Sequence, residues 1–384
     1  MASFKQAYRH KQRIAKSLLR RSGIHGVGVG YKDPAKPIKG AAVIVYADKA
    51  SATTSTKRIK MRYAKQNRGH LISTRSIHAY NKANSGSKTN IPIRIVRSSK
   101  FRTNNNQSTD NFKFRRRIRP VIAGYSVGTG DGSGTAGLIV SDKSNPRSRY
   151  ILSNNHVLVD NNSVRVSETI QPGGADEGIT KRDRVGFLNR FVKLSKKRNN
   201  FIDAATSKPL RRSLLNPRYA VFGVVPGFVR TYKVGDQFKK VGRTTGVVTG
   251  TVESIHTDIK VDYGDYGDLG TINFKNQSVI RGKRPVSLGG DSGSVWLTRR
   301  GNLAAAVNFA GADGGLLSIS YPVDWFMKVF ESRVARPSKK RICRPNRGKT
   351  NCFMYIRPLS PKVLKHNQLC TCRPGPGRKP CKSK

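Results

Sequence analysis

The chain is short of acidic residues, and this shortage is the first constraint on its partners. Of its 384 residues, 21 are Asp or Glu and 74 are Lys or Arg, which gives a net charge of +53. Acids are absent from residues 1–32, 49–109 and 332–384, so the flanks are purely cationic. Such flanks attract anions. We therefore expect a nucleic acid or another polyanion as a partner, although charge alone reads no base sequence.

Long apolar runs are also missing. No run of apolar residues is long enough to span a bilayer, so we expect no transmembrane segment. Residues 1–21 are basic but contain no seven-residue apolar core, which argues against a secretory signal. These two observations predict a cytoplasmic protein.

Cysteine is rare and confined to the C-terminal tail. Its positions are Cys343, Cys352, Cys370, Cys372 and Cys381. An odd number cannot pair completely within one chain. A zinc site that also uses His366 is an alternative, but the spacings do not match paired Cys-x-x-Cys knuckles. We expect no metal and a disordered tail over 333–384.

Glycine, by contrast, is abundant, and it separates many short β-rich runs. The chain has 37 glycines, and examples of the runs are 41–46, 137–140, 219–225 and 246–252. Short strands with glycine-rich turns predict an all-β barrel or sandwich.

The N-terminal quarter has a different pattern. Residues 5–21 are expected to form a basic helix with a thin apolar stripe, and 24–31 alternate Gly with Val as a close-packed strand does. We therefore predict a small α+β domain over 1–98. The polar, Asn-rich residues 99–116 are predicted to be a linker.

Ser292 is the candidate nucleophile. It lies in Gly289-Gly290-Asp291-Ser292-Gly293-Ser294, where neighbouring side chains cannot crowd it. Glycines also permit backbone angles that aim two amides at one point, as an oxyanion hole requires. Gly, Asp and Ser are ordinary turn residues as well, so this motif needs partners elsewhere in the chain.

His156 and Asp203 are the candidate partners. Among seven histidines, His156 alone lies where an apolar strand stops at small polar residues and an apolar run then resumes. Asp203 lies between an apolar pair and two alanines, so we expect it to be partly buried and to need a partner. The alternatives are a structural histidine and a carboxylate that caps backbone amides.

The order of these residues resembles that of the chymotrypsin-like (trypsin-like) serine peptidases, especially their bacterial branch. The matching segments are Leu152-Ser153-Asn154-Asn155-His156-Val157-Leu158, Ile202-Asp203-Ala204-Ala205, Val241-Gly242-Arg243-Thr244-Thr245-Gly246 and Gly290-Asp291-Ser292-Gly293-Ser294. Further matches are 119–121, 134–137, 171–173 and 309–311. The resemblance covers residues 117–332. It implies a double Greek-key β-barrel, with barrel one over 117–222 and barrel two over 223–332.

The resemblance also implies a function. Ser292, His156 and Asp203 would form a catalytic triad, and the amides of Gly290 and Ser292 would form the oxyanion hole. Such a serine endopeptidase hydrolyses proteins or peptides through an acyl-enzyme and needs no metal or organic cofactor. The alternative is a non-catalytic protein that binds nucleic acid or another polyanion on a peptidase scaffold. The presence of all three residues favours the enzyme.

The resemblance places the specificity pocket at Val286, Phe309 and Gly311. A valine at the pocket floor argues against a preference for Lys or Arg. It favours apolar or small side chains in the substrate, although Asp313 could still line the pocket. In the digestive enzymes a newly cut N-terminus pairs with the acid before the nucleophile, here Asp291. Because Pro120 disfavours a cut directly before it, we expect activity without obligatory processing.

Overall fold

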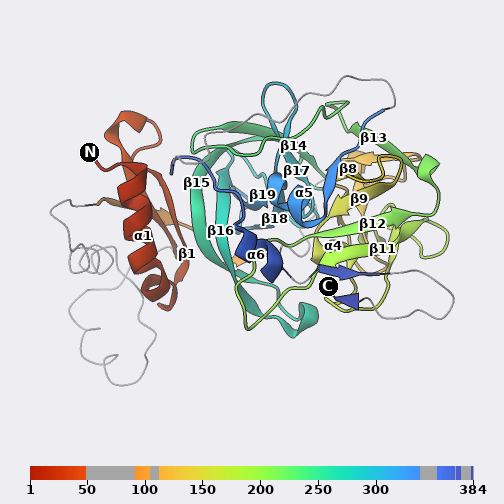
Figure 1. Cartoon of the computed structure of the whole chain (residues 1–384), viewed down its shortest axis with the longest axis horizontal. Coiled ribbons are helices and arrows are strands. Elements are labelled where there is room, and N and C mark those ends of the chain that lie inside the picture. Colours follow the sequence, from red (N-terminus) through yellow and green to blue (C-terminus); the bar gives the residue numbers. More distant parts are fainter. Residues whose placement is uncertain (49–90, 104–111, 338–352, 368, 373–381, 384) are drawn as a thin grey trace.

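The computed structural model describes residues 1–48, 91–103, 112–337, 353–367, 369–372 and 382–383. Within these residues the chain is mostly β, with a few short helices, as the sequence predicts (Figure 1). None of the helices in the described ranges is both long and apolar enough to cross a membrane.

One sheet contains most of the strands between residues 138 and 209. Its order is β20 (Ser332–Val334), β8 (Leu138–Asp142), β9 (Arg149–Ser153), β12 (Ala205–Pro209), β11 (Arg184–Val192), β21 (Leu369–Thr371) and β22 (Lys382–Ser383), with β10 (Glu168–Ile170) on β11. Two small sheets accompany it: β5 (Val121–Ala123) with β13 (Leu215–Tyr219), and β6 (Ser126–Val127) with β7 (Gly134–Thr135). The alternating apolar residues of the sheet that contains β8, β9 and β11, such as Ile139, Ile151 and Leu188, form a separate buried cluster.

The larger sheet holds ten strands. Its order is β14 (Gln237–Gly242), β17 (Val295–Thr298), β18 (Ala304–Gly311), β19 (Leu317–Pro322), β16 (Thr271–Arg281), β15 (Gly246–Asp262), β1 (Ile24–Tyr31), β2 (Ala41–Ala47) and β3 (Ile93–Arg97), and β4 (Phe101–Arg102) pairs with β15 and β18. Because β15 also pairs with β14, the path of the first six strands returns to its start.

The N-terminal elements continue this sheet. The helix α1 (Phe4–Leu19) begins at a Ser3–Gln6 capping box and buries Ile14 and Leu18. It packs beside β1, which pairs antiparallel with the C-terminal half of β15 (Figure 1). The helix and strands expected in residues 1–48 are present, and their sheet is continuous with that of the C-terminal half.

Glycines in β1 permit this close pairing. A Cβ on Gly28 would overlap the Oγ1 of Thr257, and one on Gly30 would overlap the backbone oxygen of Glu253. The Gly-Val alternation therefore places hydrogen atoms against β15, while Val27 and Val29 are fully buried in the core.

We expect Gly30→Ala to destabilise the protein by about 1–3 kcal/mol, because the added methyl group meets backbone that cannot rotate away. The measurement is the urea midpoint of unfolding. Gly132→Ala is the matched control, since a Cβ there has nothing within 4 Å. Equal midpoints for the two variants would contradict this packing.

The tail departs from the expected disorder in its described parts. β21 pairs with β11, and Cys370 and Cys372 are both buried, with Cys372 in a disulfide. Ile356 is hydrogen-bonded through its backbone to Tyr232 at 2.8 Å. The tail thus buries apolar surface on both sheets. Cys343, Cys352 and Cys381 lie outside the described residues.

Candidate active site

His156 and Asp203 are brought together by two strand ends. β9 ends at Ser153 and the short helix α4 (Asn155–Leu158) follows, so His156 lies in its first turn. Asp203 directly precedes β12, which pairs with β9. The Nδ1 of His156 lies 2.5 Å from the Oδ2 of Asp203, whose side chain is fully buried.

Two further donors hold the Asp203 carboxylate. The backbone N–H of Asn155 donates to its Oδ1 at 2.6 Å, and the hydroxyl of Tyr263 donates to its Oδ2 at 2.6 Å. Burial, and next the negative charge of Asp203, raise the pKa of Tyr263 well above its ordinary value, so this hydroxyl remains a donor. The sequence offers no signal for Tyr263, because it reaches the carboxylate from the other sheet.

These contacts determine the tautomer of His156. A carboxylate oxygen accepts hydrogen bonds, so the Nδ1 of His156 is the nitrogen that donates to Asp203. The Nε2 of His156 is buried and has no hydrogen-bond partner among the described residues. The ring is therefore arranged to accept a proton at Nε2.

Ser292 lies on a loop packed against the segment that leads to His156. The Thr135 amide donates to the Ser292 carbonyl at 2.8 Å, and a Cβ on Gly293 would overlap the Oγ of Ser153. Gly290 and Gly293 have φ of +90° and +89°, which only glycine adopts readily. Ser292 is 4% exposed. The structure shows no hydrogen bond between the Ser292 hydroxyl and the Nε2 of His156, which has no partner among the described residues. Catalytic hydrogen bonds are often long or poorly aligned in enzymes without substrate.

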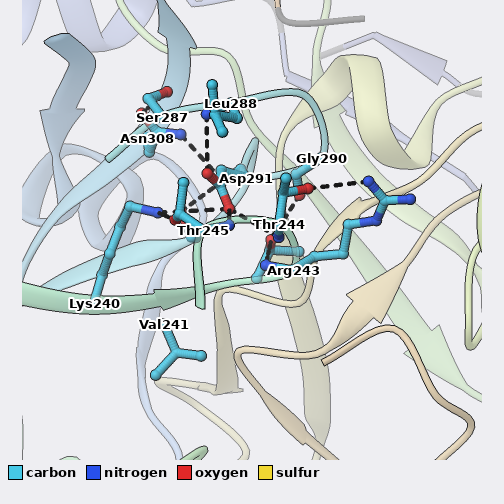
Figure 2. Close-up of polar contacts among 12 residues, drawn as sticks. Lys240, Val241, Arg243, Thr244, Thr245, Ser287, Leu288, Gly290, Asp291 and Asn308 are labelled. Carbon is cyan, nitrogen blue, oxygen red and sulfur yellow. Dashed lines mark hydrogen bonds and ion pairs between the residues drawn. The ribbon is translucent and has the colours of Figure 1, made fainter. Parts of the chain in front are cut away.

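Asp291 is the buried anchor of this loop (Figure 2). Its Oδ1 accepts from the amides of Thr244 and Thr245 at 3.1 and 3.0 Å, and its Oδ2 accepts from the Leu288 amide at 2.9 Å. The Nζ of Lys240 lies 3.8 Å from Oδ1, and both side chains are fully buried. The loop is thus tied to the turn after β14.

Lys240 supplies a cation that the sequence analysis missed. It lies on an alternating strand next to Lys239, where it looks like one more surface charge. Burial lowers its pKa, and the Asp291 charge opposes that shift. Lys240 thus gives the Asp291 carboxylate a cationic partner from within the chain.

Arg243 connects the same loop to Asp176 and to Thr135 of β7. Its guanidinium pairs with Asp176, with Nε–Oδ2 at 2.7 Å, and its backbone amide donates to the Oγ1 of Thr135 at 3.0 Å. A Cβ on Gly290 would lie 2.5 Å from the Arg243 Cδ, so the side chain packs against the loop. Arg243 is 8% exposed, and it packs against the loop of residues 289–294 that carries Ser292, here called the nucleophile loop.

The predicted pocket residues are all buried near the end of β18. Val286 and Phe309 are fully buried, Gly311 ends the strand, and Asp313 is exposed. Beside them lies a polar group that was not predicted. The Nδ2 of Asn308 donates to the Asp291 carbonyl at 3.1 Å, and its Oδ1 accepts from Ser287 and Ser318.

Among the described residues, no group of three or more His, Cys, Asp or Glu side chains is placed so that it could hold a metal ion.

Known structures resemble this chain over about half its length. No protein-family model and no curated protein matches the sequence. A glutamic acid specific serine protease is 22% identical, covering 56% of this chain and all of its own, with a TM-score of 0.40. Nocardiopsis protease (19% identity, 56% and 99% coverage, TM-score 0.40) and Cellulomonas bogoriensis chymotrypsin (20%, 56% and 97%, 0.38) are similar as well. The resemblance is to bacterial serine proteases.

Proposed function

We propose that the protein is a serine endopeptidase whose triad is Ser292, His156 and Asp203. The observation that carries the proposal is the 2.5 Å contact between the Nδ1 of His156 and the buried Asp203 carboxylate, with the Nε2 of His156 left without a hydrogen-bond partner among the described residues. A structural histidine needs one satisfied nitrogen, and it has no need of a carboxylate held by two further donors. The arrangement instead suits a base whose Nε2 gains and loses a proton.

The proposed reaction follows from the roles of these groups. The Ser292 Oγ attacks a peptide carbonyl carbon while the Nε2 of His156 takes its proton. The amides of Gly290 and Ser292 donate to the resulting oxyanion. The C–N bond breaks, His156 returns the proton to the leaving amine, and an acyl ester remains on Ser292. Water then attacks that ester while His156 takes its proton, the bond between the acyl carbon and the Ser292 Oγ breaks, and His156 returns the proton to Oγ.

Asp203 has a supporting role in this cycle. It stabilises the imidazolium that forms when His156 takes the proton, and it keeps the ring in the productive tautomer. Asn155 and Tyr263 limit its movement by their hydrogen bonds. The carboxylate is therefore already oriented before substrate arrives.

We also infer that the fold is a pair of barrels. The six-strand path from β14 to β15 that returns to its start supports barrel two, which carries Ser292. The sheet built around β8, β9, β12 and β11 supports barrel one, which carries His156 and Asp203. The site then lies where the two barrels meet.

The test is labelling of the full chain by a fluorophosphonate, which reacts with an activated serine. We expect one label per folded chain, mapped by mass spectrometry to Ser292, because the proposed triad activates this serine. Ser294, two residues further on, is the internal control, and heat-unfolded protein should take no label. Absence of label on the folded chain, or a label mapped to Ser294, would exclude the proposed role of Ser292.

A further inference from the structure

One edge of β18 runs on past the nucleophile loop. β17 pairs with β18 only from Ala304 to Val307. Asn308 then exchanges backbone hydrogen bonds with the nucleophile loop, to Gly293 and Ser294, both at 2.9 Å. Beyond Asn308, this edge has left β17 and can receive another strand. An extended peptide that pairs there therefore lies directly beside Ser292.

In the structure β4 occupies this position. Arg102 pairs antiparallel with Gly311, whose other side pairs with Ser318 of β19. β4 also pairs with the end of β15, where the Thr103 amide donates to the Asp262 carbonyl at 3.1 Å. The segment thus lies between β15 and β18, as part of one sheet.

The direction of β4 is that of a chain entering the candidate active site. β18 runs from Asn308, beside the nucleophile loop, to Gly311. Because β4 is antiparallel to it, the path from Phe101 to Thr103 leads back toward that loop. At about 3.3 Å per residue, Gly311 is about 10 Å from the level of Asn308.

The N-terminal elements hold β4 in place. Phe101 is fully buried, and its ring contacts Tyr46 and His25 edge-on, with centroids 5.6 and 6.3 Å apart. Arg102, by contrast, is exposed, so its contribution to the pairing with Gly311 comes from its backbone. One residue is anchored in the N-terminal core and the next occupies the β18 edge. A further contact joins the Ser99 Oγ to the amide of Asp313 at 2.8 Å.

We propose that β4 is an internal inhibitor of the peptidase, which occupies the edge where an extended peptide substrate would pair. This proposal rests on the proposed function. The Asp291 carboxylate is paired without any cut, but peptides reach the β18 edge only when β4 leaves it.

The test compares two variants of the full chain. Arg102→Pro removes the backbone donor and keeps β4 from pairing, whereas Arg102→Ala changes only the exposed side chain. With a fluorogenic peptide library, we expect Arg102→Pro to raise kcat/KM about tenfold or more, mainly through KM, because a larger fraction of chains has a free edge. Arg102→Ala should match the wild type. Intact mass before and after the assay controls for chain cleavage.

A second measurement keeps the test independent of folding defects. A capped peptide of residues 99–103 should inhibit the Arg102→Pro variant competitively and the wild type much less. If Arg102→Pro fails to fold, Phe101→Ala, which loosens the anchor, replaces it. The proposal that β4 is an inhibitor would be overturned if the chains take the fluorophosphonate label but neither variant changes the rate of peptide hydrolysis. Loss of fluorophosphonate labelling in every chain, including wild type, would instead strike the proposed function.

Discussion

Replacing Ser292 by alanine is expected to lower kcat/KM for peptide hydrolysis by about six orders of magnitude, because the nucleophile is lost and only transition-state binding remains. The assay uses chains that also carry Arg102→Pro, so that the substrate edge is free. If β4 does not inhibit, this background equals the wild type and the comparison still holds. Circular dichroism should show that the fold of the Ser292→Ala chain is unchanged.

The same prediction has a sharper form in the double variant. Residues of a triad act as one unit, so adding His156→Ala to Ser292→Ala should cost almost nothing further. His156→Ala alone should be nearly as damaging as Ser292→Ala. If the decreases in log kcat/KM of the two single variants add up to that of the double variant, the two residues act separately. That result would contradict the triad.

Lys240→Met is expected to destabilise the protein by about 3–5 kcal/mol, because the buried Asp291 carboxylate then loses the whole amino group that faces it, as donor as well as cation. It should also abolish labelling of Ser292, because Asp291 anchors the loop through the amides of Thr244 and Leu288. Unfolding in urea and fluorophosphonate labelling measure the two effects.

Lys239→Met is the matched control for that change. Lys239 is the neighbour of Lys240 on β14, is only half-buried, and lies over the ring of Phe222. We expect a change within about 0.5–1 kcal/mol and normal labelling. A Lys240→Met chain that labels at the wild-type rate would show that the ion pair does not position the loop.

The pH dependence gives Lys240 a further signature. Because burial lowers its pKa below the usual value of 10.5, the folded chain loses this proton at a lower pH than the unfolded chain does. Activity should therefore fall as the pH rises through that lowered pKa. Over the same interval the unfolded chain binds more protons, so this group's contribution to stability rises with pH. As the pH rises, the protein should therefore lose its activity before it unfolds.

The local sequence was sufficient to propose the residues of the site. The glycines around Ser292 and the ends of the apolar strands at His156 and Asp203 are local signals, and the triad that they predict stays a prediction. Lys240 and Tyr263 were not recognisable, since each resembles an ordinary strand residue until its distant partner is known. The expected disorder of the tail was inferred from composition, which says nothing of the strand edge that β11 offers to β21.

The sequence by itself determined the features that depend on neighbouring residues: the short strands, the glycine positions and the cationic flanks, whose polyanion partner stays a prediction. The tertiary structure decided which distant groups meet. It placed β1 on β15, Lys240 on Asp291 and β4 on β18. The physical reason is that strand pairing and burial depend on long-range register, whereas composition and periodicity describe only the local chain.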